Sequence, residues 1–253
     1  MNTLRSEWTK LRTQPSAAWA LVTTLAAIVG FGILYSLVRV TRPPQGPDAV
    51  GAFDPTAVSL AGVNLGQLAI GVLGVLLISN EYATGMIRST LSAVPSRLPV
   101  LWGKATVMVL VTVALCVPAT VAAFLAGQSV LSRQHLDIAF GTPGVARAVL
   151  GSALYVGIVG LLGLGLGALI RNTAGAVCTL IAALFGLQLV LALAPMGVQD
   201  HVYRYLPGPA GLAVTAVHPD PDALAPWVGL GVFCAYVAIV LALAAYRLRR
   251  KDA

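Results

Sequence analysis

The sequence predicts an all-α integral membrane protein with six transmembrane helices. Of its 253 residues 58% are hydrophobic and only 10% are charged, and the mean hydropathy is +0.86. A soluble domain has about 45–50% apolar and about 25% charged residues, so this chain has too few charges to cover a surface facing water. Its apolar residues also form six long windows without any Asp, Glu, Lys or Arg. These features argue against a soluble enzyme, a disordered chain and a secreted disulfide scaffold.

The N-terminal segment 1–16 is expected to be cytoplasmic and to contain a short amphipathic helix. Leu4, Trp8 and Leu11 stand at i, i+4 and i+7, which places them on one face of a helix. The cations Arg5, Lys10 and Arg12 lie off that stripe. Two interpretations remain open and are compatible: an interface helix lying in the inner membrane surface, and a simple positively charged anchor.

Each apolar window can cross the roughly 30 Å of bilayer hydrocarbon, which takes about 20 helical residues. The runs are continuously apolar, whereas lipid-facing strands of a barrel alternate, so helices are favoured. We expect one membrane domain over 1–253, with spans near 17–38, 59–79, 105–126, 148–170, 174–194 and 227–246.

The connector 80–104 between the second and third spans carries an apolar stripe. Ile87, Leu91 and Val94 stand at i, i+4 and i+7 on a predicted helix of two to three turns, which ends before Pro95. Its other face is polar. Such a helix suits docking to a soluble partner, and it would also suit a helix lying flat on lipid.

Small residues predict close packing of the fourth span, where Gly163 and Gly167 have the GxxxG spacing. Packing within one subunit is the simpler interpretation, and a subunit interface is the other. The long outer connector 195–226 contains a weakly apolar stretch, 210–217, that is too short to span. It either dips into the outer leaflet or forms an ordered loop.

The charge balance indicates topology. There are 16 Lys and Arg against 9 Asp and Glu. In a soluble protein this excess would suggest nucleic acid, but in a membrane protein Lys and Arg concentrate on the cytoplasmic side. With six spans both termini share one side, and placing them inside puts 11 cations in and 5 out. We therefore expect cytoplasmic termini, including the basic tail 247–253, and no nucleic-acid partner.

Motifs for chemistry are absent from the sequence. It has no GxxxxGK[ST], and the nearest fragment, 103–105, lacks both the first glycine and the hydroxyl. It has no GxSxG or HExxH, and its three histidines are far apart. The six windows contain no acid, so a membrane-embedded proton relay is unsupported. Gln188 is the most polar side chain deep in a window, with hydrogen bonding to another helix or contact with substrate as its alternatives. We expect no catalytic, metal or cofactor-binding residues and no enzymatic activity.

One motif resembles a known family. The run Glu81-Tyr82-x-x-Gly85-Met86-Ile87-Arg88-x-x-Leu91-x-x-x-Pro95-x-Arg97, with Lys104 after it, is similar to the signature connector of ABC-2 type transporter permeases. The segment 6–12 before the first span is similar to bacterial members. The resemblance covers the whole chain, although Met86 stands where Thr is frequent.

The resemblance implies a permease subunit of an ATP-binding cassette exporter in the bacterial inner membrane. It implies a second permease chain, identical or different, and a separate ATPase subunit that binds the ATP. The coupling helix that docks on the ATPase would include Glu81, Tyr82, Gly85, Arg88 and Leu91. Leu4, Trp8 and Leu11 would belong to an interface helix beside it.

The alternatives are a six-span carrier that needs no ATPase and a membrane-embedded enzyme. Glu81 has two possible roles: an ion pair within the chain, with Arg97 or Lys104, or direct contact with the ATPase. The transported substrate is not assigned by the sequence.

Overall fold

The predicted all-α membrane architecture is confirmed. The computed structural model describes residues 15–42, 53–83, 98–217 and 222–250, and within these ranges it contains helices and no strand. Six helical segments of this part are long and apolar enough to cross a membrane. They are α2 (Pro15–Thr41), α5 (Val63–Ala83), α7 (Leu98–Leu131), α8 (Val145–Ile170), the segment from α9 (Thr173–Ile181) through a π-helix (Ala182–Gly186) to α10 (Leu187–Leu191), and α13 (Pro226–Arg250).

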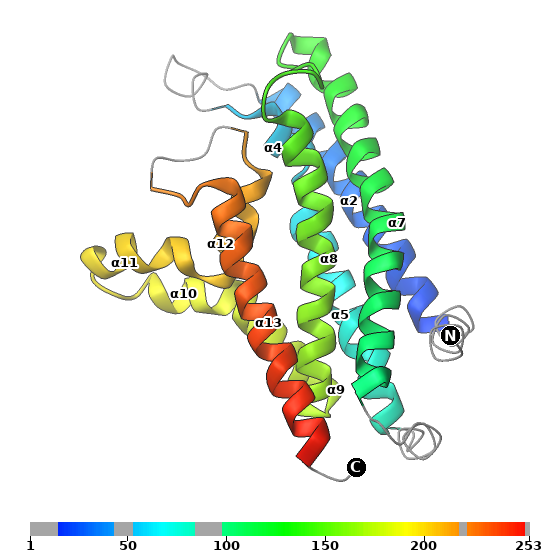
Figure 1. Cartoon of the computed structure of the whole chain (residues 1–253). Coiled ribbons are helices and arrows are strands. Elements are labelled where there is room, and N and C mark those ends of the chain that lie inside the picture. Colours follow the sequence, from blue (N-terminus) through cyan, green and yellow to red (C-terminus); the bar gives the residue numbers. More distant parts are fainter. Residues whose placement is uncertain (1–14, 43–52, 84–97, 218–221, 251–253) are drawn as a thin grey trace.

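Helix α8 is the centre of the bundle. It packs against α5, α7 and α13, while α2 covers α5 and α7 from the other side. Figure 1 shows the first helix starting and the last helix ending at the same end of the bundle, where α5 also ends and α7 begins. The core side chains Tyr155, Phe124 and Phe233 are fully buried. Both described ends of the chain lie at the same end of the bundle, as an even number of membrane-spanning segments requires.

Glycines let α8 approach α5 at backbone distance, as the GxxxG spacing predicts. A Cβ on Gly163 would collide with the carbonyl oxygen of Gly71, and a Cβ on Gly167 would come within 2.9 Å of the carbonyl oxygen of Val75. Gly74 lies equally close to Gly160 on the opposing helix. The interpretation of helix packing within one subunit is confirmed, because these glycines meet inside one chain.

We predict that Gly163→Ala lowers the free energy of unfolding by about 1–3 kcal/mol, because the added methyl group overpacks a backbone contact. Gly30→Ala is the matched control: it is also in a long helix, and a Cβ there meets nothing within 4 Å. Alanine favours helix more than glycine does, so the control is expected to be neutral or slightly stabilising. Thermal unfolding of the detergent-solubilised variants measures both, and equal melting temperatures would contradict the assigned α5–α8 contact.

Polar side chains tie together the loops at the end opposite the termini. Asp54 caps the short helix α4 (Pro55–Ser59) by accepting from the backbone N–H groups of Thr56 and Ala57. Its second oxygen accepts from the N–H of Val217 at 3.0 Å. Gln128 of α7 donates to Ser59 and accepts from the N–H of Ile138. These bonds join the loops that precede α5, α8 and α13 into one layer.

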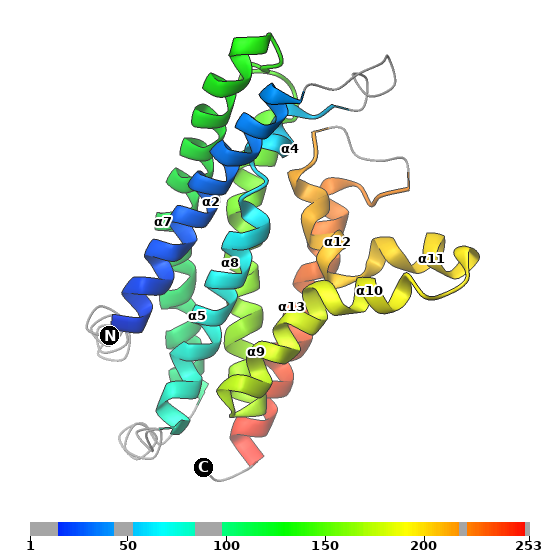
Figure 2. The same cartoon turned by 180° about the vertical axis from the view of Figure 1, so that it is seen from behind.

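The fifth apolar window is not a straight helix. It bends through the π-helix, and Figure 2 shows α10 and α11 (Met196–Val202) projecting sideways from the bundle. A π-helix is a common site of such irregularity. The chain then turns back through the 3₁₀-helix Tyr203–Tyr205, α12 (Pro207–Leu212) and the 3₁₀-helix Ala213–Thr215.

The stretch 210–217 of the predicted outer connector packs into the bundle. Gly211 lies against the Tyr155 and Phe233 rings, with no space for a Cβ, and Gly229 of α13 approaches the carbonyl oxygen of Ala210 equally closely. Ala210 and Val214 are fully buried. Residues 207–215 of the connector are therefore a packed helical element, and entry of the connector into the outer leaflet stays a prediction.

The helix boundaries on both sides of the predicted connector 80–104 differ from those expected from hydropathy. Helix α5 continues to Ala83 and α7 already begins at Leu98, so both ends of the predicted connector 80–104 are helical. The predicted coupling helix within 84–97 and the predicted amphipathic helix within 1–14 lie outside the described residues.

Candidate functional site

An ion pair is buried where α5 and α7 flank the connector 84–97. Lys104 Nζ lies 2.9 Å from Glu81 Oε1, and the two side chains are only 2% and 7% exposed. Lys104 also donates to the carbonyl oxygen of Leu77 at 3.0 Å. A charge this deeply buried requires a partner, because its desolvation costs several kcal/mol. The pair therefore fixes the last turn of α5 against the second turn of α7.

A second contact joins the neighbouring helix ends. The guanidinium of Arg171 lies over the Tyr82 ring, with 5.1 Å from Cζ to the ring centroid. Arg171 follows α8 in the left-handed conformation, with φ of 61°, and its N–H donates to the carbonyl oxygen of Gly167. This geometry ends α8 and aims the side chain back at α5.

The last helix joins the same group of contacts. Arg247 in the final turns of α13 donates from Nη1 to the carbonyl oxygen of Leu169. This carbonyl is one of the last in α8, to which no N–H group of the helix itself can donate. The side chains of Glu81, Tyr82, Lys104, Arg171 and Arg247, here called the basal cluster, thus connect α5, α7, α8 and α13.

The structure describes only part of the predicted docking residues. Glu81 and Tyr82 stand in the last turn of α5 and belong to the basal cluster. Of the two roles predicted for Glu81, the ion pair within the chain is confirmed, with Lys104 as the cation. The remaining predicted site residues lie outside the described ranges: Gly85, Arg88, Leu91, Leu4, Trp8 and Leu11.

Sequence reasoning missed Arg171 and Arg247 as site residues and treated them only as topological charges. The signal that could have identified Arg171 is its position: it is a lone cation in a break of only a few residues between two apolar windows. Such a short break forces a tight turn that keeps Arg171 at the end of the bundle. Its Nε and one Nη atom are buried without a hydrogen-bond acceptor among the described residues.

The centre of the bundle is filled by side chains. Tyr155 of α8 donates its hydroxyl to Gln67 Oε1 of α5, and both residues are almost completely buried. Gln67 in turn donates to the carbonyl oxygen of Asn64. Phe233 of α13 packs on the Tyr155 ring, 5.3 Å between centroids. The contact region of α5, α8 and α13 is thus a packed core rather than a passage.

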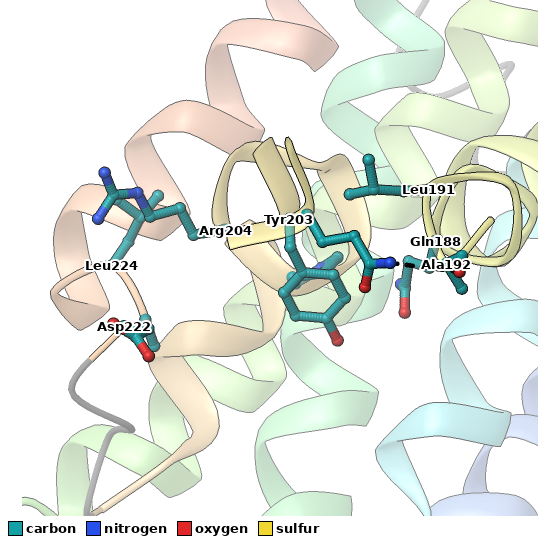
Figure 3. A pocket seen from close by; sticks show the side chains of 10 residues that line it. Gln188, Leu191, Ala192, Tyr203, Arg204, Asp222 and Leu224 are labelled. Carbon is teal, nitrogen blue, oxygen red and sulfur yellow. Dashed lines mark hydrogen bonds between the residues drawn. The ribbon is translucent and has the colours of Figure 1, made fainter. Parts of the chain in front are cut away.

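Gln188 was predicted to hydrogen-bond another helix or to contact substrate. The first alternative is wrong among the described residues: Gln188 Nε2 donates to the carbonyl oxygen of Leu184, one turn earlier in the same segment. Gln188 instead lines a pocket on the flank of the bundle (Figure 3). No group of three or more potential metal ligands is found in the described part of the chain.

The sequence of the chain matches a known protein family. A family model described as ABC-2 family transporter protein matches residues 3–198. These residues include the first five spans and the connector with its flanking helices. A search of curated proteins found no match.

Proposed function

This chain belongs to the ABC-2 transporter family, and from this membership we propose its function. It is a multi-pass membrane protein of a transport permease family, with six membrane-spanning helices. Within that frame, we propose that it is the permease subunit of an ATP-driven exporter, and that two permease chains form the translocation path together. The family match is the observation that carries this proposal.

The filled bundle centre supports a path between two chains. Tyr155, Gln67 and Phe233 occupy the space where a passage through a single chain would have to run. A second permease, identical or different, would supply the opposite wall. Exposed apolar side chains of α2 and of the segment just after α10, among them Trp19, Leu34 and Leu193, are available to face lipid or such a partner.

The sequence supports a separate ATPase, because no P-loop is present in it. The residues between Ala83 and Leu98 would dock on that subunit. The Glu81–Lys104 pair holds the two helices that carry this connector, so it would pass a push from the ATPase into the bundle. This coupling role of the basal cluster is part of the proposal.

The orientation in the bacterial inner membrane is also proposed, with both termini in the cytoplasm. It is supported by the excess of cations on that side and by the common end of the first and last helices in Figure 1. Docking of a cytoplasmic ATPase on residues 84–97 requires this orientation.

A carrier driven by an ion gradient is the second candidate. Such carriers usually have an acidic residue within a span, and the six predicted spans contain none. The membrane-embedded enzyme has no supporting group of residues in the described part of the chain.

We predict that the purified chain hydrolyses no ATP, and that hydrolysis appears only when a P-loop ATPase is co-expressed and co-purified with it. The rate of phosphate release from reconstituted vesicles measures this. The control is the same complex with the P-loop lysine of the ATPase replaced by alanine. Hydrolysis by the chain alone that survives removal of any partner would contradict the proposal, and so would transport that needs only an ion gradient.

A further inference from the structure

A pocket lined by two opposite charges, Arg204 and Asp222, lies beside the projecting helices. It has a volume of about 410 Å³ and is lined by α10, α11, the 3₁₀-helix Tyr203–Tyr205, the start of α12 and residues 222–224. Figure 1 shows α10 and α11 leaving the bundle partway between its two ends. The pocket is within the range of about 300–1,000 Å³ that is typical for small ligands.

Arg204 is positioned to bind an anion. Its guanidinium packs over the Tyr205 ring, 5.2 Å from Cζ to the centroid. Its Nε is buried and has no acceptor among the described residues. A guanidinium held by stacking keeps its N–H groups fixed, and it favours planar recognition of phosphate or carboxylate. The pocket therefore offers a pre-oriented donor for an anionic group.

Asp222 supplies a negative charge on the same pocket. Figure 3 shows the Arg204 guanidinium and the Asp222 carboxylate on one side of the Tyr203 ring, pointing apart from each other. In the part of the chain that the structure describes, no ion pair joins Arg204 and Asp222. The salt bridge found there joins Lys104 and Glu81. Two opposite charges that line one pocket without neutralising each other suit a ligand that carries both signs.

The remaining polar groups favour a primary ammonium as the cationic part. Gln188 and Gln199 use their Nε2 atoms as donors to backbone carbonyls, so these bonds leave their Oε1 atoms as acceptors, and both residues line the pocket together with Asp222. A primary ammonium has three N–H donors to give to such acceptors, whereas a quaternary ammonium has none. The acceptor set therefore discriminates between these two headgroup chemistries.

The surroundings of the pocket suit acyl chains. Leu189, Val190 and Leu193, on α10 and just after it, are 73%, 67% and 87% exposed. These side chains do not line the pocket themselves, but they lie on the segment that forms one of its walls, and such a combination of exposed apolar and charged groups forms the amphipathic surface that a lipid would match. A soluble zwitterion would make no use of this apolar surface.

We propose that this pocket binds the headgroup of a membrane phospholipid with a phosphoethanolamine group. Arg204 takes the phosphate, Asp222 with the glutamine oxygens takes the ammonium, and the acyl chains lie along α10. This assignment does not depend on the proposed export function, because lipid binding needs no ATPase.

The test is lipid titration of the purified full chain by native mass spectrometry, using phosphatidylethanolamine, phosphatidylcholine and phosphatidylglycerol with identical acyl chains. The wild type should bind the ethanolamine lipid several-fold more tightly than the other two. Arg204→Gln and Asp222→Asn should each weaken that binding about ten-fold, the usual effect of losing a charged hydrogen bond. Asp222→Asn should leave the choline lipid unaffected.

The matched controls are Arg133→Gln and Asp137→Asn, which remove the same charges from exposed positions away from the pocket. Both should bind all three lipids as the wild type does. Arg204→Lys keeps the charge but loses the stacked fork, so a partial loss is expected and guards against a folding artefact. Equal affinity of the wild type for the three lipids, or unchanged binding in the pocket variants, would overturn the proposal. Displacement of the lipid by an equal concentration of free phosphoethanolamine would overturn the assignment to a membrane lipid.

Discussion

Replacing Lys104 by methionine should lower the free energy of unfolding by about 3–5 kcal/mol, because it breaks the buried ion pair with Glu81. The two side chains are almost inaccessible to water, so solvent cannot replace the lost partner. The variant also lacks the hydrogen bond that Lys104 donates to the carbonyl oxygen of Leu77. Equilibrium unfolding in mixed micelles, followed by circular dichroism, measures the effect.

The double variant Glu81→Met, Lys104→Met tests whether the loss comes from the uncompensated charge. Hydrophobic replacement of a whole buried pair is often neutral or stabilising, so the double variant should recover most of the stability lost in the single one. Arg133→Met, which removes an exposed cation, should change the free energy of unfolding little. If the double variant is as unstable as Lys104→Met, the ion pair is not the reason for the loss.

Placing an aspartate at Leu91 should abolish recovery of the ATPase with the permease and should stop transport, while membrane insertion continues. The sequence places Leu91 in the middle of the apolar stripe with Ile87 and Val94. A carboxylate in a dry contact costs several kcal/mol, which would reduce binding by orders of magnitude. Insertion should survive because none of the six helices is altered. Co-purification at equal permease abundance is the measurement.

Two variants of the same segment serve as controls. Ser92→Asp introduces the same charge on the predicted polar face, and Arg88→Glu reverses a charge at the predicted rim. Both should weaken docking much less than Leu91→Asp, since exposed charges contribute little. Equal recovery of the ATPase with Leu91→Asp and with wild type would mean that the helix lies on lipid. The outcome also tests the orientation, because an ATPase can reach this segment only from the cytoplasm.

The six helices could be predicted from the sequence because the physical rule is local. A run of about 20 residues without charge cannot be solvated, and its backbone groups must be satisfied within the segment. The spacing of Gly163 and Gly167 also predicted a close helix contact, although not its partner. Identifying Gly71 and Val75 as the opposing backbone required the packed structure.

The boundaries near Glu81 and Lys104 could not be predicted in the same way. A hydropathy window ends at the first charge, since a single charge in lipid is expensive. Here the opposite charges of Glu81 and Lys104, which are 23 residues apart in the sequence and belong to different helices, form an ion pair. The helices therefore continue past both, and only the three-dimensional pairing removes the cost that the window rule assigns to each charge.

The sequence by itself determined the helical class, the six apolar segments and the position of the connector, because these follow from composition and from spacing within single segments. The tertiary structure decided the bend after Ile181, the return of residues 207–215 into the bundle and the convergence of Arg204 and Asp222 on one pocket. Each of these depends on contacts between distant segments, such as the bond from Val217 to Asp54 and the packing of Gly211 on Tyr155. Hydropathy describes the preference of a residue for lipid or water. It does not say which neighbour will bond to a given polar group, and these pairings determined the arrangement of the site residues.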